Sequence, residues 1–320
     1  MLALRLLVNI RYHYASHAFI MHHSSATSVS SRREPGKLNR NTIRKRVLAL
    51  LKLPVMQSIR KVLTIAGSDS GAGAGIQADL KTFAAHGVYG TSAITAITAQ
   101  NTVSVTAVLA LSPRLVAAQI DAIIDDIGAH AVKTGMLANA GIIDAVARKI
   151  SEHRLKNIVV DPVMVATSGD LLIRKNAVAL LRSKLIPLAT VVTPNIPEAE
   201  VLTGMTLRTA AEIKEAAQCI VKMGAQTVIV KGGHLKGPAM DPFFDGKKFT
   251  PLTAPRMRTH NTHGTGCTLS AAIAANLAHG QNVATAVANG KRYITDALRH
   301  SYRIGSGHSP VHHFYRYWKS

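Results

Sequence analysis

Short apolar runs alternate with longer helical patterns along the chain from residue 61 onward. The apolar runs lie at residues 62–66, 130–134, 157–160, 190–192 and 227–230. The stretches between them that have the apolar spacing of helices are residues 75–85, 113–127, 138–153, 174–186 and 209–223. Apolar runs of this length are typical of buried parallel strands. Their alternation with helices predicts right-handed crossovers and an α/β fold, a doubly wound, mostly parallel sheet with helices on both faces.

Further strands are expected at the edges of the sheet. Residues 92–108 hold two runs rich in Thr, Ile and Val, which are typical of strands. Residues 243–249 place an Asp-Gly pair between strand-like residues, a pattern that predicts a hairpin. Residues 61–320 contain no internal repeat and no linker-like stretch, so we expect a single domain over residues 59–320.

The basic residues of the chain are unevenly distributed. The 320 residues carry a formal net charge of +21, and residues 1–60 hold 11 Lys and Arg residues against one acid, Glu34. We expect residues 1–58 to be a basic extension without stable structure. An acid-poor, Arg- and Ser-rich N-terminus is typical of an organelle transit peptide. Met56, just before the first predicted strand, would instead be the start site of a cytoplasmic protein, and both interpretations remain open.

The composition excludes several classes of protein. No stretch of 18 apolar residues occurs, which excludes a membrane-spanning helix. Two cysteines, Cys219 and Cys267, are too few for a disulfide scaffold. Only 4% of the residues are aromatic, which argues against a stacking platform for single-stranded nucleic acid. We therefore expect small-molecule partners, and neither a membrane nor a nucleic acid.

A glycine-rich loop follows the first predicted strand. Residues 67–79 read Gly-Ser-Asp-Ser-Gly-Ala-Gly-Ala-Gly-Ile-Gln-Ala-Asp. Such a loop lets the backbone approach a ligand at the carboxyl end of a strand. It is not a dinucleotide-binding fingerprint, because no acid lies between Asp79 and Asp121 to bind a ribose. It also lacks the Gly-Lys-Ser/Thr of a Walker A motif.

A second glycine loop lies near the C-terminus. Residues 261–268 read Asn-Thr-His-Gly-Thr-Gly-Cys-Thr and lead into a strong helical pattern at residues 269–278. Residues 264–266 would present free backbone N–H groups at a helix N-terminus, where an anion such as a phosphate is stabilised. Cys267 lies in the first turn, where the same field is expected to lower the pKa of its thiol.

Polar residues follow three of the other predicted strands. Asp161, Glu198 and Lys231 each come at or soon after the end of an apolar run. The carboxyl ends of parallel strands are where an open α/β sheet binds its ligand. Two carboxylates suit Mg²⁺, and a lysine neutralises phosphate charge. Together with the anion-binding loop, these residues predict phosphoryl transfer.

The motifs together resemble those of the hydroxymethylpyrimidine/phosphomethylpyrimidine kinases, the thiamine-pathway members of the ribokinase-like superfamily. The resemblance extends over about residues 61–315, essentially the whole predicted domain. The segments that carry it are residues 66–83, 98–101, 133–137, 161–164, 193–198, 231–234 and 261–268. One departure is Ala72, where many relatives have glycine. Residues 1–58 have no counterpart in the family pattern.

The resemblance implies two ATP-dependent phosphorylations of 4-amino-5-hydroxymethyl-2-methylpyrimidine, to the monophosphate and then to the diphosphate, in thiamine biosynthesis. It also implies Mg²⁺, with Asp161 and Glu198 as its ligands, and a homodimer. The implied pyrimidine contacts are Gly67, Asp79, Gln100, Met136, Val163 and Cys267. The implied nucleotide contacts are Asn195 and Lys231. The implied catalytic residues are Cys267, Lys231, Gly264, Thr265 and Gly266.

Cys267 favours the pyrimidine kinases over other members of the superfamily. The sugar kinases and typical pyridoxal kinases of the superfamily carry an aspartate at this position as the proton acceptor. Some pyridoxal kinases that resemble this family also carry the cysteine, so a vitamin B6 kinase is the alternative function. A catalytically inactive, nucleotide-binding regulator on the same fold is a further alternative, against which the intact loop and Lys231 argue.

Overall fold

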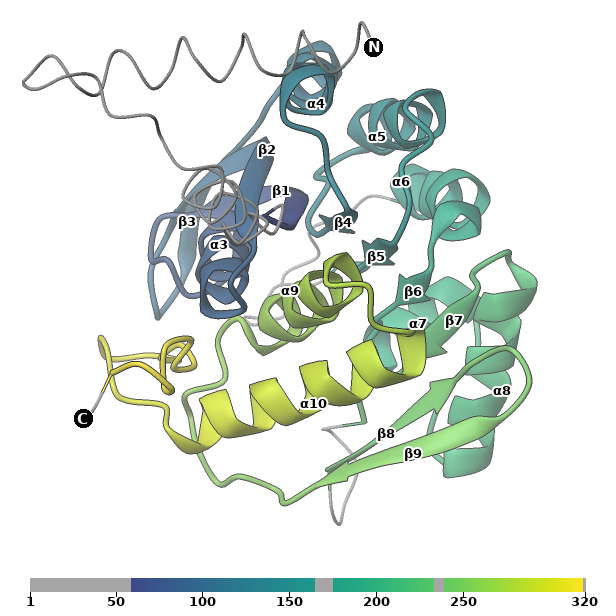
Figure 1. Ribbon diagram of the computed structural model, residues 1–320. Helices are drawn as coiled ribbons and strands as arrows, with labels where there is room; N and C mark the ends of the chain where they lie inside the picture. The colour runs from purple at the N-terminus through teal and green to yellow at the C-terminus, as the bar shows by residue number, and fades with distance from the viewer. Residues whose placement is uncertain (1–58, 165–174, 233–238, 319–320) are drawn as a thin grey trace, which may run out of the picture. The chain divides into compact units, whose positions relative to one another are not determined.

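A nine-stranded sheet forms the centre of the part of the chain that the structure describes (Figure 1). The structure is a computed structural model, and it describes residues 59–164, 175–232 and 239–318. The strands are β1 (Lys61–Asp69), β2 (Tyr89–Gln100), β3 (Val105–Ala110), β4 (Ala131–Thr134), β5 (Ile158–Val160), β6 (Val191–Val192), β7 (Thr227–Ile229), β8 (Ala239–Phe244) and β9 (Phe249–Ala254). Their order across the sheet is β3-β2-β1-β4-β5-β6-β7-β8-β9. The strands from β2 to β7 in this order are parallel, and β3, β8 and β9 pair antiparallel at the two edges.

Helices cover both faces of the sheet. On one face lie α3 (Gly75–Ala85), α9 (Thr265–Ala278) and α10 (Val283–Arg299). On the other lie α4 (Pro113–Asp126), α5 (Ala140–Glu152), α6 (Lys175–Leu180), α7 (Ile196–Thr203) and α8 (Ala210–Lys222). Figure 1 shows α9 and α10 packed side by side. The predicted α/β class, with a mostly parallel sheet between two layers of helices, is confirmed.

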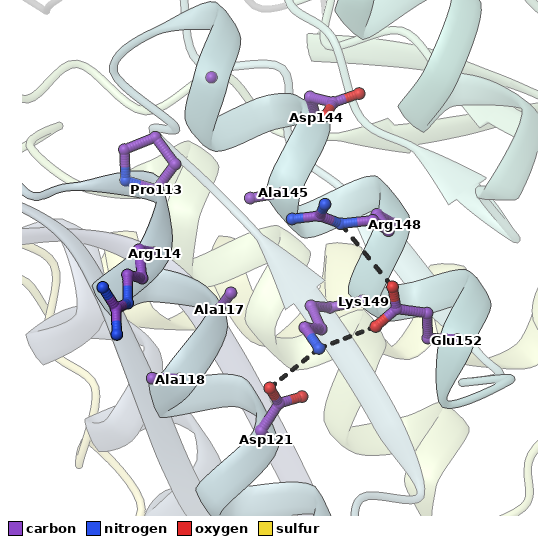
Figure 2. A pocket seen from close by; sticks show the side chains of 11 residues that line it. Pro113, Arg114, Ala117, Ala118, Asp121, Asp144, Ala145, Arg148, Lys149 and Glu152 are labelled. Atoms are coloured by element: carbon purple, nitrogen blue, oxygen red, sulfur yellow. Dashed lines mark ion pairs between the residues drawn. The ribbon is translucent and has the colours of Figure 1, made fainter.

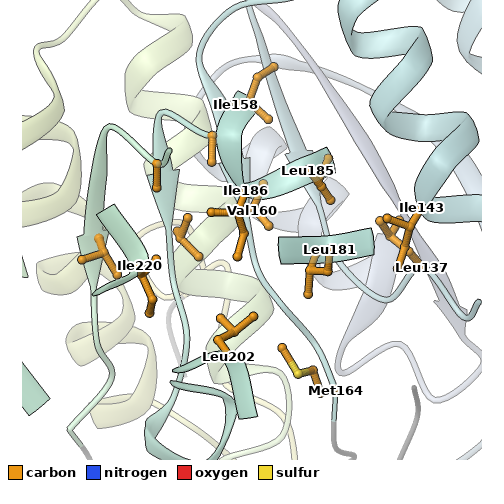
Figure 3. Close-up of a cluster of buried hydrophobic side chains, with 14 of the residues drawn as sticks. Leu137, Ile143, Ile158, Val160, Met164, Leu181, Leu185, Ile186, Leu202 and Ile220 are labelled. Carbon is orange, nitrogen blue, oxygen red and sulfur yellow. The ribbon is translucent and has the colours of Figure 1, made fainter. Parts of the chain in front are cut away.

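The inner strands are buried on both faces because consecutive residues of a strand point to opposite sides. In β5, Ile158 and Val160 join the apolar cluster on the α5 side, whereas Val159 joins the cluster formed with α9 and α10. Figure 3 shows the first cluster, in which Leu181 and Leu202 lie among the strand residues. The continuous apolar runs of the sequence therefore reflect a core on each side of the sheet.

The structure departs from the predicted elements in its helices. The patterns do not predict α7 or α10, and the structure adds both. The helix predicted at residues 174–186 ends as α6 at Leu180, and a π-helical turn (Leu181–Leu185) and a 3₁₀ turn (Ile186–Leu188) follow. Pro187, within the last turn, has no backbone N–H and cannot continue a regular helix.

The predicted hairpin is confirmed as β8 and β9. Asp245 Oδ1 accepts hydrogen bonds from the backbone N–H groups of Lys247 and Lys248, at 2.9 and 2.8 Å. Gly246, between Asp245 and Lys247, has a φ of +90°, which glycine adopts without steric cost. The Asp-Gly pair therefore forms the turn that its sequence predicts.

The predicted basic extension, residues 1–58, lies outside the described residues. Ser58–Ser320 form one compact unit. Among the helices that the structure describes, none is long and apolar enough to cross a membrane.

We expect a shortened chain that begins at Met56 to fold and to keep its activity. Both large apolar clusters are built from residues between Val62 and Val311 and already cover the two faces of the sheet. Thermal unfolding of the shortened and full chains, measured side by side, should give the same midpoint. A lower midpoint or aggregation of the shortened chain would show that residues 1–55 stabilise the domain.

Candidate active site

The predicted site residues gather where the parallel strands end and α9 begins. Gly67 lies near the end of β1, and Met136 and Asp161 follow β4 and β5. Lys231 follows β7, and residues 264–267 form the start of α9. The carboxyl ends of parallel strands share one edge of the sheet, which explains why segments far apart in the sequence meet here.

The two glycine loops meet backbone to backbone. Gly264 has a φ of +77°, in the left-handed region, and caps the N-terminus of α9. A Cβ atom on Gly264 would overlap the backbone oxygen of Gly73. Any other residue at 264 would therefore force the loops apart, in addition to adopting a strained backbone conformation.

We expect Gly264→Ala to lower turnover at least tenfold, and Gly204→Ala to leave it unchanged. Gly204 has a nearly identical φ of +75°, so both variants carry the same backbone strain, but no atom lies within 4 Å of the position that a Cβ on Gly204 would take. That strain costs about 1–2 kcal/mol of stability. Only Gly264→Ala adds the collision with Gly73. Equal turnover of the two variants at a temperature where both are folded would show that the contact between the loops does not matter.

The first glycine loop is shaped by its own backbone and by Lys81. Ala72 has a φ of +60°, a left-handed conformation that glycine adopts more readily than alanine. The Ala72 N–H donates to the Asp69 carbonyl at 2.9 Å, and the Lys81 Nζ donates to the Ala72 carbonyl at 2.8 Å. These bonds hold the alanine in its unfavourable conformation.

Lys231 lies between two buried carboxylates. Its Nζ is 3.0 Å from Asp161 Oδ1 and 3.6 Å from Glu198 Oε2. Burial alone would lower the pKa of Lys231, but Asp161 and Glu198 raise it well above its ordinary value, so the side chain is charged. A Cβ atom on Gly266 would lie 3.1 Å from Lys231 Nζ. The ammonium group therefore lies beside the first turn of α9. The structure corrects one expectation for this turn: the Thr265 N–H is not free, because it donates to the Thr262 carbonyl at 3.3 Å.

Two further side chains hold the carboxylate of Asp161. Thr193 Oγ1 donates to Asp161 Oδ1 at 3.0 Å, and Ser270 Oγ donates to Oδ2 at 3.2 Å. Burial would raise the pKa of Asp161, but Lys231 and Lys133 lower it below its usual value. Asp161 is thus an ionised carboxylate fixed by Thr193, which follows β6, by Lys231, which follows β7, and by Ser270 of α9.

Glu198 and Asn195 form the N-terminus of α7. The Asn195 side chain accepts the Glu198 backbone N–H at 2.8 Å, and Glu198 Oε2 accepts the Asn195 backbone N–H at 2.7 Å. This is a capping box, which fixes the Glu198 carboxylate next to Lys231. The backbones of Asn195 and Lys231 also form an isolated parallel β-bridge. Gly233 and His234, which follow Lys231 in the motif at residues 231–234, lie outside the described residues.

Asp79 is fully buried and belongs to an ion pair. Lys133 Nζ donates to both of its carboxylate oxygens, at 3.0 and 2.8 Å, and Thr64 Oγ1 donates to Oδ2 at 2.6 Å. Burial would lower the pKa of Lys133, but Asp79 raises it well above the usual range, as do Cys267 and Asp161. The sequence analysis includes Lys133 only as part of a motif, and nothing in the spacing pairs it with Asp79.

The structure corrects the expectation that the thiol of Cys267 has a lowered pKa. Burial raises the pKa of Cys267 to about 11, and the carboxylates of Asp79 and Asp161 add to the increase. Lys133 and the Gly75 backbone N–H act in the opposite direction and are outweighed. The field at a helix N-terminus is therefore not the dominant influence on this thiol.

Gln100 approaches the second glycine loop at its other side. The Gln100 Nε2 is 3.4 Å from His263 Nε2, and His263 Nε2 is 2.8 Å from Asp69 Oδ2. An ionised carboxylate only accepts hydrogen bonds, so His263 Nε2 carries the proton that it shares with Asp69. His263 Nε2 therefore cannot also accept a hydrogen bond from the Gln100 amide. The Gln100 amide can donate to a ligand instead.

Two of the remaining predicted pyrimidine contacts, Gly67 and Met136, touch one another, and the third, Val163, lies beside Asp161. A Cβ atom on Gly67 would lie 2.6 Å from the Met136 methyl group, so these two residues are in contact. Thr95 Oγ1 donates to the Met136 carbonyl at 2.6 Å and fixes that segment. Val163, half-buried, follows Asp161 by two residues, and its N–H donates to the Asp161 carbonyl at 2.8 Å.

A separate groove lies between α4 and α5, with a volume of about 540 Å³ (Figure 2). Ion pairs among Lys149, Asp121 and Glu152 cross one end of it. None of the predicted site residues lines this groove. The motifs and the converging polar groups, rather than cavity size, locate the candidate active site.

Known proteins are similar to the chain over most of its length. A family model described as phosphomethylpyrimidine kinase matches residues 69–312. A hydroxymethylpyrimidine/phosphomethylpyrimidine kinase from Rhizobium meliloti (strain 1021) is 55% identical over 261 residues, which are 80% of this chain and 98% of the relative.

Two solved structures are similar in fold and in sequence. An ADP complex of Bacillus subtilis pyridoxal kinase is 43% identical with a TM-score of 0.76, and the match covers 80% of this chain and 98% of that one. A phosphomethylpyrimidine kinase from Clostridium difficile 630 is 44% identical with a TM-score of 0.68, and the match covers 75% of this chain and 99% of that one.

Proposed function

The chain belongs to the phosphomethylpyrimidine kinase family, and we propose that it uses ATP to phosphorylate hydroxymethylpyrimidine, first to the monophosphate and then to the diphosphate. The observation that carries this proposal is the start of α9, where Gly266, in the first turn of the helix, lies beside the charged Lys231. This arrangement suits the oxygens of a transferring phosphoryl group. The product would serve thiamine biosynthesis, as the resemblance of the motifs to those of the thiamine-pathway kinases implies.

Each part of the site has a role in this reaction. The N–H groups at the start of α9 would hold the transferring phosphoryl group, and Lys231 would neutralise its negative charge. Gln100 would donate to the pyrimidine, and Met136 would contact the face of the ring. Cys267, in the first turn of α9, would accept the proton of the attacking hydroxyl group.

Asp161 and Glu198 fit the magnesium ion that the family resemblance implies. Their carboxylates converge on Lys231 Nζ, at 3.0 and 3.6 Å, and so approach one another. Mg²⁺ is usually bound through one or two carboxylates together with water and substrate phosphates, which matches this donor set. Bound there, it would neutralise charge on the triphosphate of ATP.

Vitamin B6 kinase activity is the second candidate function. The B. subtilis pyridoxal kinase is 43% identical to this chain over 98% of the kinase's own length. The C. difficile phosphomethylpyrimidine kinase is similar to a comparable degree, at 44% identity. The hydroxymethylpyrimidine and pyridoxal are both substituted aromatic nitrogen heterocycles with a primary alcohol. The fold and the anion-binding loop serve either substrate, so the pyrimidine-facing side chains must discriminate.

A panel of acceptors tests the proposal. Purified protein with ATP and Mg²⁺ is given the hydroxymethylpyrimidine, its monophosphate or pyridoxal, and ADP release is measured for each. We expect kcat/KM to be highest for the two pyrimidines. Pyridoxal turned over best would favour the vitamin B6 kinase, and no turnover of any acceptor would favour a nucleotide-binding regulator. If the monophosphate accumulates and is not converted to the diphosphate, the second phosphorylation is not an activity of this protein.

The proposal includes the assembly and location implied by the family resemblance. We propose that the chain works as a homodimer in the cytoplasm, or in an organelle if residues 1–58 are a transit peptide. Sedimentation of the purified chain and mass spectrometry of its native N-terminus test these two statements.

A further inference from the structure

The Asp69 carboxylate shapes the first glycine loop. Its Oδ1 accepts the Gly71 N–H at 2.8 Å, and its Oδ2 accepts the N–H groups of Gly73 and Ala74 at 3.0 and 2.7 Å. Asp69 is buried at the end of β1, and although burial would raise its pKa, hydrogen bonds from His263 and Ala74 hold the pKa below its usual value. An ionised carboxylate therefore accepts three backbone N–H groups of the loop, those of Gly71, Gly73 and Ala74.

His263 connects the second glycine loop to the same carboxylate. Its Nε2 lies 2.8 Å from Asp69 Oδ2, although the two residues are 194 positions apart. The His263 ring also lies against Gly73 so closely that a Cβ atom on Gly73 would overlap it. His263 directly precedes Gly264, the N-cap of α9, so the contacts of this ring fix the backbone just before the helix begins.

The start of α9 is thus supported from two sides. On one side, the His263–Asp69 pair joins it to the first glycine loop. On the other side, Lys231 lies beside Gly266 and is held by Asp161. Residues 264–266 lie between His263 and Cys267 in the chain, so the position of the first turn of α9 relative to the first glycine loop depends on both contacts.

We propose that His263 is a positioning residue for phosphoryl transfer: its hydrogen bond to Asp69 holds the start of α9 at the distance from the first glycine loop that the reaction needs. This inference rests on the proposed function. His263 acts through Gly264 and the N–H groups that follow, and the reacting atoms are contacted by those groups. A misplacement of about 1 Å at a reacting centre can cost about 10²-fold in rate, so a large effect is expected without direct contact.

Three substitutions of His263 test the hydrogen bond itself. His263→Ala removes the donor, and His263→Gln places an amide nitrogen at a similar distance from the backbone as the original Nε2. His263→Asn has a shorter side chain, whose amide nitrogen corresponds to Nδ1 and does not reach Asp69. We expect kcat to fall about 10- to 100-fold in the Ala and Asn variants, and the Gln variant to recover most of it. A residue that only contributed to stability would leave kcat unchanged in every variant that is folded at the assay temperature.

His153→Ala is the matched control. His153 Nε2 makes a comparable contact with Asp121 Oδ1, at 2.7 Å, between α5 and α4. Its loss removes a histidine–carboxylate bond of the same kind at a place that lines no part of the active site. We expect its kcat to equal that of the unmodified protein.

A second readout needs no substrate. Amide hydrogen exchange of residues 70–75 and 262–267 should become faster in His263→Ala and stay slow in His263→Gln. If the unmodified protein fails to phosphorylate the pyrimidine, the proposed function is wrong and this exchange pattern still tests the contact. If the protein is active and the Ala variant has unchanged kcat, or if Gln behaves like Ala in both measurements, the positioning role is wrong.

Discussion

Replacing Cys267 with alanine is expected to slow the first phosphoryl transfer by about 10²- to 10⁴-fold, the usual worth of a positioned proton acceptor, and to slow the second transfer much less. The first acceptor is an alcohol, whose oxygen must lose a proton as it attacks the γ-phosphorus. The second acceptor is a phosphate monoester, whose second pKa is about 6, so its oxygens are already ionised at neutral pH. A group that accepts a proton is therefore needed for the first transfer only.

The pH dependence of the two transfers should differ for the same reason. A proton acceptor works in its deprotonated form, and the pKa of the Cys267 thiol is raised to about 11. The rate of the first transfer should therefore rise with pH from neutral to alkaline conditions, and Cys267→Ala should lose this rise. Cys267→Asp, whose carboxylate is ionised at neutral pH, should keep more activity than the alanine variant and show a flatter profile. Single-turnover rates with each acceptor measure these effects.

Cys219→Ala is the control for the loss of a thiol. Cys219 is the other free cysteine, on α8 and away from the glycine loops, and its replacement should leave both transfers unchanged. ATP affinity should stay nearly constant in all three variants. A first transfer that runs at the unmodified rate in Cys267→Ala would show that the thiol is only part of the wall of the pyrimidine site.

Replacing Lys133 with methionine is expected to lower the free energy of unfolding by about 3–5 kcal/mol, because it leaves a buried charge without its partner. Lys133 and Asp79 are both fully buried, and Thr64 is the other side-chain donor to the carboxylate. Chemical denaturation of the variant and of the unmodified protein gives this difference. The size of the effect comes from the stranded carboxylate rather than from the strength of the ion pair.

A double substitution separates these two contributions. Lys133→Met combined with Asp79→Leu removes both charges and should recover most of the lost stability, since apolar replacements of a buried pair are often neutral. Arg299→Met, which breaks the exposed ion pair between Arg299 and Asp296 on α10, is the control and should change stability little. A double variant as unstable as Lys133→Met alone would contradict this account.

The sequence predicts helices well where their apolar face is long and uninterrupted. α10 has Ala286, Val287 and Ile294 on its buried face, a spacing typical of a helix, but Gly290 interrupts the pattern. The structure explains that glycine: a Cβ atom there would lie 2.8 Å from Ile273 of α9, so the glycine allows the two helices to pack closely. α7 has only eight residues and includes Pro197, which makes its pattern too short to identify.

The sequence by itself determined the layers of the fold and the chemical groups of the site. Buried strands need apolar side chains on both faces, and tight loops need glycine, so both leave a local pattern. Asp161, Glu198 and Lys231 could be expected near one another because parallel strands end at one edge of a sheet.

Only the tertiary structure decided how these groups act on one another. The pairing of Asp69 with His263, the burial of Asp79 with Lys133 and the raised pKa of the Cys267 thiol all depend on distances between segments far apart in the chain. Electrostatic energies and desolvation vary steeply with those distances and with the exclusion of water. A local pattern specifies which residue types are present at each strand end, and the packing of the loops against one another sets their charge states and their roles.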